Sequence, residues 1–106
     1  MRVNTWSATD TQTNDTATAS SPDLTAYPEL RHRLRLVVAS VGDGGEAALT
    51  VESGDVTLIE AQVVGGGPLV IPCDIQGEAG EAITATLSAA GQDIDGSLSI
   101  SGHLEQ

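Results

Sequence analysis

The chain has 106 residues, 40% of them hydrophobic, and a formal net charge of −11 at pH 7 from 15 carboxylates and four arginines, without any lysine. This length allows one domain with a short extension but not two domains. The negative charge makes nucleic acid an unsuitable partner, because its phosphates would be repelled. No run of about 18 apolar residues is present, so we also expect no membrane-spanning segment.

The acidity without lysine has two explanations that the sequence leaves open. A GC-rich genome replaces lysine codons with arginine codons, and a salt-accumulating (halophilic) host selects acidic surfaces. In the second case self-repulsion is tolerable, because the Debye length is only about 3 Å at about 1 M salt.

Residues 1–28 differ in composition from the rest of the chain. The run SATDTQTNDTATASSPD is rich in Thr, Ser and Asp and has no apolar period, so it cannot form a core of its own. We predict an extended N-terminal arm that a neighbouring subunit holds in place; pairing of the arm with its own domain is the alternative. Trp6 and Tyr27 are the two aromatic residues of the chain and the candidate anchors, because aromatic side chains are enriched at interfaces.

Residues 29–106 are predicted to form a β domain whose core is built from Leu, Val, Ile and Ala. Short alternating runs are separated by turns rich in Gly, Asp and Ser. These runs are residues 30–41, 46–53, 56–64, 69–75, 82–90 and 97–105. We therefore expect an all-β protein, an antiparallel β-sandwich of about six to eight strands, Ig-like or jelly-roll-like, with the extended N-terminal arm. Pro72 confines its strand to a sheet edge or a bulge.

The segment 30–41 contains three of the four arginines. Its period of two directs one set of side chains to the core, namely Leu30, His32, Leu34, Leu36 and Val38. Arg31, Arg33 and Arg35 then project from the other face. This stripe is either a solvated strand face or a docking site for an acidic partner, since arginine binds carboxylates through two parallel hydrogen bonds.

The sequence contains no convincing catalytic set, and we predict a protein that is not an enzyme and uses no cofactor. A nucleophilic triad would need His32 or His103 beside Cys73 or a serine, oriented by a carboxylate. His32 lies in the apolar phase of its strand, and Cys73 follows Pro72 in a short apolar strand. Both residues are better explained as buried structural side chains.

The segment Asp93-Ile94-Asp95-Gly96 resembles the opening of a calcium-binding loop. The full pattern of an EF-hand is not met, because position 12 falls on Leu104, which is followed by Glu105. A turn rich in Asp and Gly explains the same residues. We predict no metal site, and a cation at Asp93 and Asp95 stays an open alternative.

Two long stretches of the chain carry a resemblance to a known group of proteins. They are LTVESGDVTLIEAQVVGGGPLVIP (49–72) and GEAITATLSAAGQDIDGSLSISGHLE (80–105). Together they resemble small β-sandwich structural proteins of tailed bacteriophages and related archaeal viruses, most of which are capsid decoration or cement proteins. The chain departs from that group in its acidity and in the lack of aromatic residues in its final strand.

The resemblance implies a virion protein at the capsid surface that binds and stabilises the lattice of the major capsid protein. It also implies association with itself, as a homotrimer. The alternative is a small tail, turret or fibre component with a ligand- or carbohydrate-binding β-sandwich. Sugar binding usually requires exposed aromatic side chains, and residues 29–106 contain none. The partner-binding candidates are Trp6, Tyr27 and the arginine stripe.

Overall fold

The computed structural model describes residues 4–105, which form eight β-strands. The strands are β1 (Asn4–Thr13), β2 (Ala17–Ser20), β3 (Arg31–Val41), β4 (Glu46–Ser53), β5 (Val56–Val64), β6 (Leu69–Gln76), β7 (Ile83–Leu87) and β8 (Asp95–Glu105). Across this part of the chain, no helix is long and apolar enough to cross a membrane.

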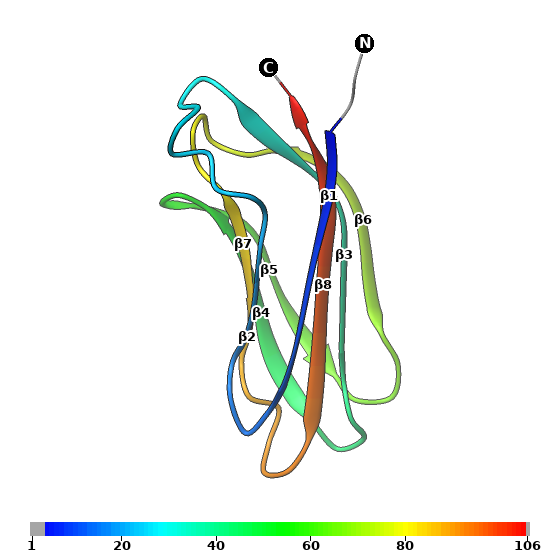
Figure 1. The fold of residues 1–106 in the computed structure, drawn as a ribbon. Coiled ribbons are helices and arrows are strands. Elements are labelled where there is room, and N and C mark those ends of the chain that lie inside the picture. The colour runs from blue at the N-terminus through cyan, green and yellow to red at the C-terminus, as the bar shows by residue number, and fades with distance from the viewer. Residues whose placement is uncertain (1–3, 106) are drawn as a thin grey trace.

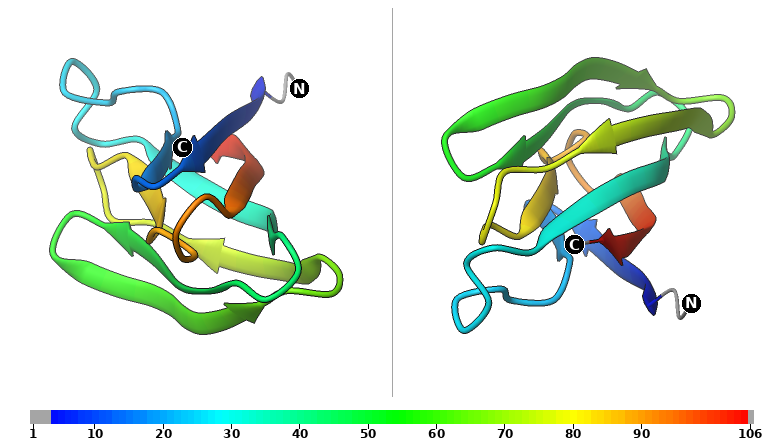
Figure 2. Two further views of the ribbon diagram at one scale, coloured as in Figure 1. Left: turned by 90° about the horizontal axis from the view of Figure 1, so that it is seen from below. Right: turned by 90° about the horizontal axis from the view of Figure 1, so that it is seen from above.

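The strands form two four-stranded antiparallel sheets that face each other as layers (Figures 1 and 2). One sheet has the order β1-β8-β3-β6 and is called here the β8 sheet; the other has the order β2-β7-β4-β5 and is called the β4 sheet. This crossing of the chain between the layers is the jelly-roll arrangement. The predicted all-β sandwich of six to eight strands is confirmed, and of the two topologies left open the structure has the jelly roll.

The prediction of an extended N-terminal arm was wrong, because residues 4–20 belong to the sandwich. β1 pairs with β8 along its whole length, from Asn4 opposite Leu104 to Thr13 opposite Asp95, and β2 pairs with β7. Thr, which is frequent in this segment, suits strands, and the inward positions of β2 are small side chains that fill little of the core. The sandwich therefore begins at Asn4 instead of residue 29, as the alternative of self-pairing expected.

The core between the sheets is aliphatic. Its largest fully buried hydrophobic side chains come from both layers and are Leu34, Leu49, Ile83, Leu87, Leu98, Ile100, Val37, Val51 and Val63. Small alanines of β2, β3, β4 and β7 complete it. Small and branched aliphatic side chains fill the space between the two sheets, so the core that residues 4–105 form contains no central aromatic ring.

β3 contains a bulge that changes which of its side chains face the core. Its register against β8 shifts between Leu34 and Leu36, so that Arg35 is an extra residue. His32 and Leu34 are buried before the bulge, and Val37 is buried after it. The prediction that Leu36 and Val38 face the core was wrong, because the bulge reverses the alternation and turns both outward.

β6 is the edge strand of the β8 sheet and pairs with β3. Pro72 lies opposite Leu36, directly beside the register shift. A proline has no N–H to donate to a sheet ladder, which is tolerated at an edge or a bulge. The predicted confinement of Pro72 to such a position is confirmed.

Candidate interaction surface

The outer side of the β8 sheet carries a flat array of uncharged side chains, called here the hydroxyl face. Strand alternation and register place its members on one side of the sheet. They are Thr5, Ser7, Thr9 and Thr11 of β1, Ser97, Ser99 and Ser101 of β8, Leu36, Val38 and Ser40 of β3, and Val70 and Pro72 of β6. None of these side chains is acidic, although the chain carries a net charge of −11.

The outer side of the β4 sheet differs in charge. Glu46 and Glu52 of β4 and Glu60 of β5 are exposed there, and Glu60 lies opposite Thr50 in the sheet. Carboxylates are thus spread over the outside of one layer and kept off the middle of the other. Total charge does not explain this placement, which marks the hydroxyl face as a separate kind of surface.

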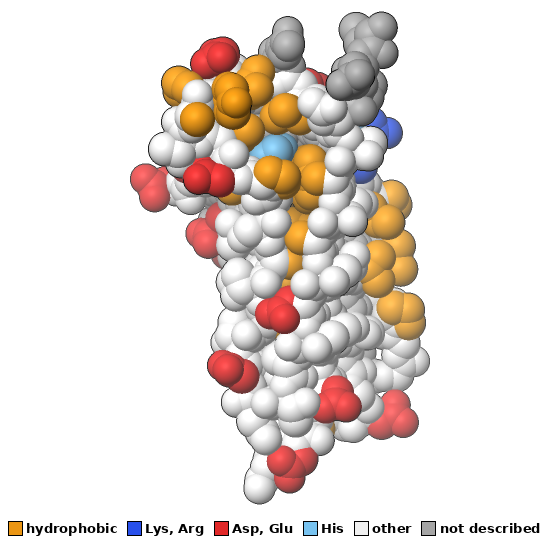
Figure 3. All heavy atoms as spheres, viewed as in Figure 1, with side chains coloured by type: hydrophobic (Ala, Val, Ile, Leu, Met, Phe, Trp, Pro, Cys, Tyr) orange, Lys and Arg blue, Asp and Glu red, His pale blue; other side chains and the backbone are white. Residues whose placement is uncertain are grey.

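Apolar side chains gather along one border of the hydroxyl face. Val70 is 53% exposed, and it lies opposite Val38, as Pro72 lies opposite Leu36. Figure 3 shows hydrophobic side chains along the border of the molecule formed by β6, with arginine beside them towards the end that holds the termini. Contiguous apolar groups at a surface are typical of sites of protein contact.

Arg33 is engaged by carboxylates of its own chain. Its Nε donates to both Oε1 and Oε2 of Glu105, at 3.1 Å each, and its Nη1 donates to Oδ1 of Asp74 at 3.1 Å. The hydrogen bond from Arg33 is the main cause that holds the pKa of Glu105 below its ordinary value. Arg33 therefore links the end of β8 to β6. Most of its hydrogen-bond donors are used in these contacts, so few are left to bind a partner.

The other two arginines of the stripe have different surroundings. Nη1 of Arg31 donates to the backbone oxygen of Gly77 at 3.2 Å. The side chain of Arg35 is 55% exposed, and its Nη1 lies 3.9 Å from Oδ1 of Asp74, which is too long for a hydrogen bond. Of the predicted stripe, Arg35 is the most available to a partner; partner binding by the three arginines stays a prediction.

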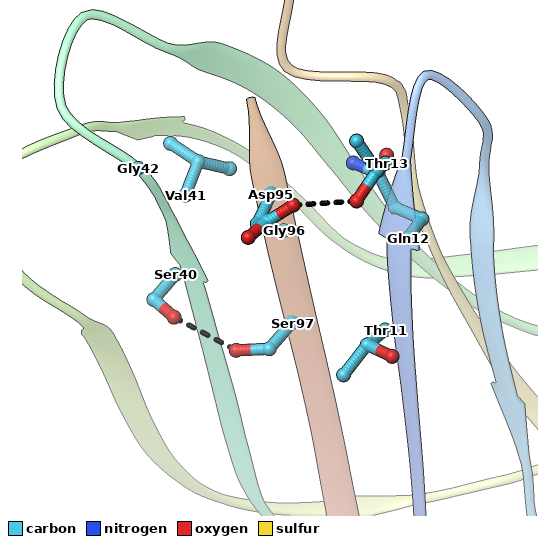
Figure 4. A pocket seen from close by; sticks show the side chains of 9 residues that line it. All are labelled: Thr11, Gln12, Thr13, Ser40, Val41, Gly42, Asp95, Gly96 and Ser97. Carbon is cyan, nitrogen blue, oxygen red and sulfur yellow. Dashed lines mark hydrogen bonds between the residues drawn. The ribbon is translucent and has the colours of Figure 1, made fainter. Parts of the chain in front are cut away.

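Two shallow hollows lie at opposite ends of the hydroxyl face. One, of about 580 Å³, is lined by Arg35 together with Ser7 and Ser101. The other, of about 650 Å³, is lined by Asp95 and its neighbours Thr11, Thr13, Ser40 and Ser97 (Figure 4). One end of the face therefore offers the guanidinium of Arg35, with the carboxylate of Asp74 beside it, and the other end offers the carboxylate of Asp95.

Asp93 and Asp95 join two turns of the sandwich. Nδ2 of Asn14 donates to Oδ1 of Asp93 at 3.0 Å, and the Asp93 N–H donates to Oδ1 of Asn14 at 2.8 Å. Oγ1 of Thr13 donates to Oδ1 of Asp95. Among residues 4–105 no three or more His, Cys, Asp or Glu side chains are grouped as metal ligands would be. These contacts agree with the turn interpretation of this segment.

Trp6 and Tyr27 line one cleft at the end of the sandwich that holds the termini. The cleft has a volume of about 410 Å³, and Leu24, Leu30, His32 and Leu104 complete its apolar wall. Trp6 and His32 contact each other edge to face, with ring centroids 5.2 Å apart. Both aromatic residues were predicted as anchors from the sequence. That they line the same cleft was not predicted, because it depends on the pairing of β1 with β8.

His32 and Cys73 are held in structural surroundings. His32 is 1% exposed, and its Nε2 donates to the backbone oxygen of Pro22 at 2.8 Å. Burial raises the pKa of the Cys73 thiol, and its Sγ lies 3.6 Å from the backbone oxygen of Leu34. A thiol that stays protonated is a poor nucleophile. That the protein is not an enzyme stays a prediction.

Comparison with known proteins places the chain by its fold. No protein-family model matches it, and no curated protein matches it by sequence. Among solved structures, it is similar to the Drosophila NLP core, described in terms of pentamer formation and histone binding, with a TM-score of 0.62 and 16% identity over 97% of this chain and 99% of that one.

Two further solved structures match the chain with lower TM-scores. They are the C-terminal CBM6 of the marine laminarinase LamC from Zobellia galactanivorans (TM-score 0.48, 18% identity, 97% and 100% covered) and the VLP of the extra small virus of the prawn Macrobrachium rosenbergii (TM-score 0.38, 9% identity, 96% and 80% covered). At such identities the comparisons show the fold alone. The chain has a jelly-roll β-sandwich, and a fold by itself does not define a function.

Proposed function

We propose that the chain is a virion structural protein, a capsid decoration or cement protein that binds the lattice of the major capsid protein. The observation that carries this proposal is the hydroxyl face. A strongly acidic chain keeps carboxylates off the whole middle of one sheet and borders that region with apolar side chains and Arg35. Such a surface is suited to permanent contact with protein.

The mechanism is the addition of buried area across the boundaries between capsid subunits. A stable interface buries about 800 Å² on each partner, and the outer side of a four-stranded sheet offers a surface of that order. Each contact that spans two subunits must be broken before they separate, so the covered lattice dissociates less readily. The homotrimer that the resemblance implies is untested, and the mass of the protein in solution decides between it and the pair proposed below.

The proposal is tested with capsids assembled from the major capsid protein encoded in the same genome. We expect the purified protein to co-sediment with these capsids at high salt and to raise the temperature at which they dissociate. Ser99→Arg, in the middle of the hydroxyl face, should weaken both effects about tenfold or more, because it places an unpaired charge in the contact.

Ala48→Arg is the matched control, since it makes the same change of charge at an exposed, uncharged position on the outer side of the β4 sheet. This variant should bind as the unchanged protein does. A protein that neither sediments with the capsids nor alters their dissociation would contradict the decoration role.

The cleft favours a second candidate function, a tail, turret or fibre component that binds a small ligand or carbohydrate. Residues 29–106 lack aromatic side chains, but β1 brings Trp6 to the sandwich, and Tyr27, which is 56% exposed, lines the same cleft. Calorimetric titration with a panel of neutral sugars tests this candidate. Binding that is lost in Trp6→Ala, in a protein that ignores capsids, would support it over decoration.

A further inference from the structure

We propose that the hydroxyl face binds a second copy of this chain, face to face, about a two-fold axis that runs across the strands. In this pair, Arg35 of each copy meets Asp95 of the other. The inference rests on the proposed function in that it names the partner of the same assembly surface. The pair would be the form of the free protein. On the capsid, the major capsid protein would replace the second copy on the same face, and the clefts at the ends of the sandwich would stay free.

Charge decides which surface two copies can share. Each chain carries a net charge of −11, so association of like chains is opposed unless the contact keeps carboxylates apart. Contact through the β4 sheet would bring Glu46, Glu52 and Glu60 of one copy against the glutamates of the other, with no arginine among the described residues of that face to offset them. Contact through the hydroxyl face opposes uncharged side chains in its middle. Its carboxylates, Asp74, Asp95 and Glu105, lie at its ends and are balanced by three arginines of β3, so this face has the lower repulsion of the two sheet faces.

The ends of the face are complementary to each other. Arg35 lies at the bulge, beside the positions of β3 that pair with Ser101 and Gly102, and Asp95 begins β8. At about 3.3 Å per residue, the two positions are roughly 20 Å apart along the strands. An axis midway between them reverses the strand direction and carries the Arg35 hollow of one copy onto the Asp95 hollow of the other.

The midpoint of the face is a row of register partners. Ser99 lies opposite Thr9 on β1 and opposite Val38 on β3, and Val38 lies opposite Val70 on β6. An axis along this row brings each member against itself in the second copy. Valines then meet valines and hydroxyls meet hydroxyls, so the face is self-complementary in polarity as well as in charge, as a two-fold contact requires.

The side chains also suit close packing of two sheets. Sheets with larger side chains pack about 10 Å apart. The short Ser and Thr side chains allow the two sheets to approach more closely than that, so that their hydroxyl groups can exchange hydrogen bonds. Oγ1 of Thr13 contacts one oxygen of Asp95. A carboxylate accepts through both oxygens, so Asp95 can hold Arg35 of the second copy as well.

A charge exchange at the two ends tests the pairing. Sedimentation equilibrium of the full chain should give the mass of a dimer for the unchanged protein. Arg35→Asp opposes two carboxylates and Asp95→Arg opposes two guanidinium groups, so each single variant should weaken association about tenfold or more. The double variant R35D/D95R restores opposite charges and should recover most of the affinity.

Circular dichroism and the melting temperature show that each variant is folded, since Asp95→Arg also removes the bond from Thr13. Glu60→Arg on the other sheet is the control and should stay dimeric. A monomer or a trimer for the unchanged protein, or a folded double variant without recovery, would overturn the pairing. Dimers that fail to coat capsids would overturn the decoration role alone.

Discussion

The two outer faces of the sandwich have the same backbone architecture but differ in how charge is placed on them. In the part of the chain that the structure describes, the outer side of the β4 sheet carries glutamates without any arginine. The outer side of the β8 sheet carries its carboxylates only at its ends, has three arginines, and presents serine, threonine and valine in its middle. Both faces alternate with the same buried aliphatic core, so folding does not require the difference. In a very acidic protein, the informative feature of a surface is where carboxylates are missing. Three sets of substitutions test the difference between the two faces.

The largest effect is expected when a carboxylate is placed in the middle of the hydroxyl face. Val38→Asp would oppose two acids across the proposed axis and bury both without a partner, so association should fall about 100-fold or more. Ala48→Asp makes the same change in the middle of the β4 sheet and should alter association by less than about threefold. Sedimentation measures both, and equal losses in the two variants would remove the distinction between the faces.

A smaller effect concerns the ion pair that closes one end of the β8 sheet. Because Arg33 lowers the pKa of Glu105 in the folded chain, its stabilising contribution is complete above the ordinary pKa of a glutamate and is lost as the pH falls through the lowered value. Arg33→Gln should therefore lower the melting temperature at neutral pH, and the difference from the unchanged protein should shrink in acid. A difference that stays constant with pH would mean that Arg33 acts through packing.

The smallest effect is expected from removing charge on the β4 sheet. The double variant Glu52→Gln and Glu60→Gln reduces self-repulsion, so its melting temperature should rise slightly at low salt. The gain should vanish at about 1 M salt, where the Debye length is about 3 Å. Glu105→Gln also removes a carboxylate but loses the contact with Arg33, and it should lower the melting temperature; a rise would contradict the role of that ion pair.

Several features of the fold were readable from local pattern, and others were not. The strands after residue 30 follow from their alternation and turns, and the edge position of Pro72 follows from its missing N–H. β1 and β2 were not predicted as strands of the sandwich. Their inward residues, such as Ala8, Ala17 and Ala19, are only weakly hydrophobic and alternate with polar residues, so the alternation typical of a strand is hard to see. Such short side chains become recognisable as core only when Leu and Ile of other strands pack on them.

The candidate surface was readable only in part. The clustering of three arginines in residues 31–35 marked this segment as a candidate site in the sequence. In the structure, the three side chains have different surroundings. The hydroxyl face gave no signal in the sequence, because its members come from four strands far apart in the chain. The register shift at Arg35 also moved Leu36 and Val38 from the expected core to this face, and a bulge depends on pairing with β8 that no local pattern contains.

The sequence by itself determined the class of this protein: all-β, with an aliphatic core, strong acidity and cations gathered in one strand. These properties follow from composition and from a period of two, which are local. Tertiary structure alone decided the jelly-roll topology, the inclusion of residues 4–20 in the sheets, the cleft between Trp6 and Tyr27, and the uncharged face. Each of these depends on contacts between strands distant in the chain, where register sets which side chains share a surface.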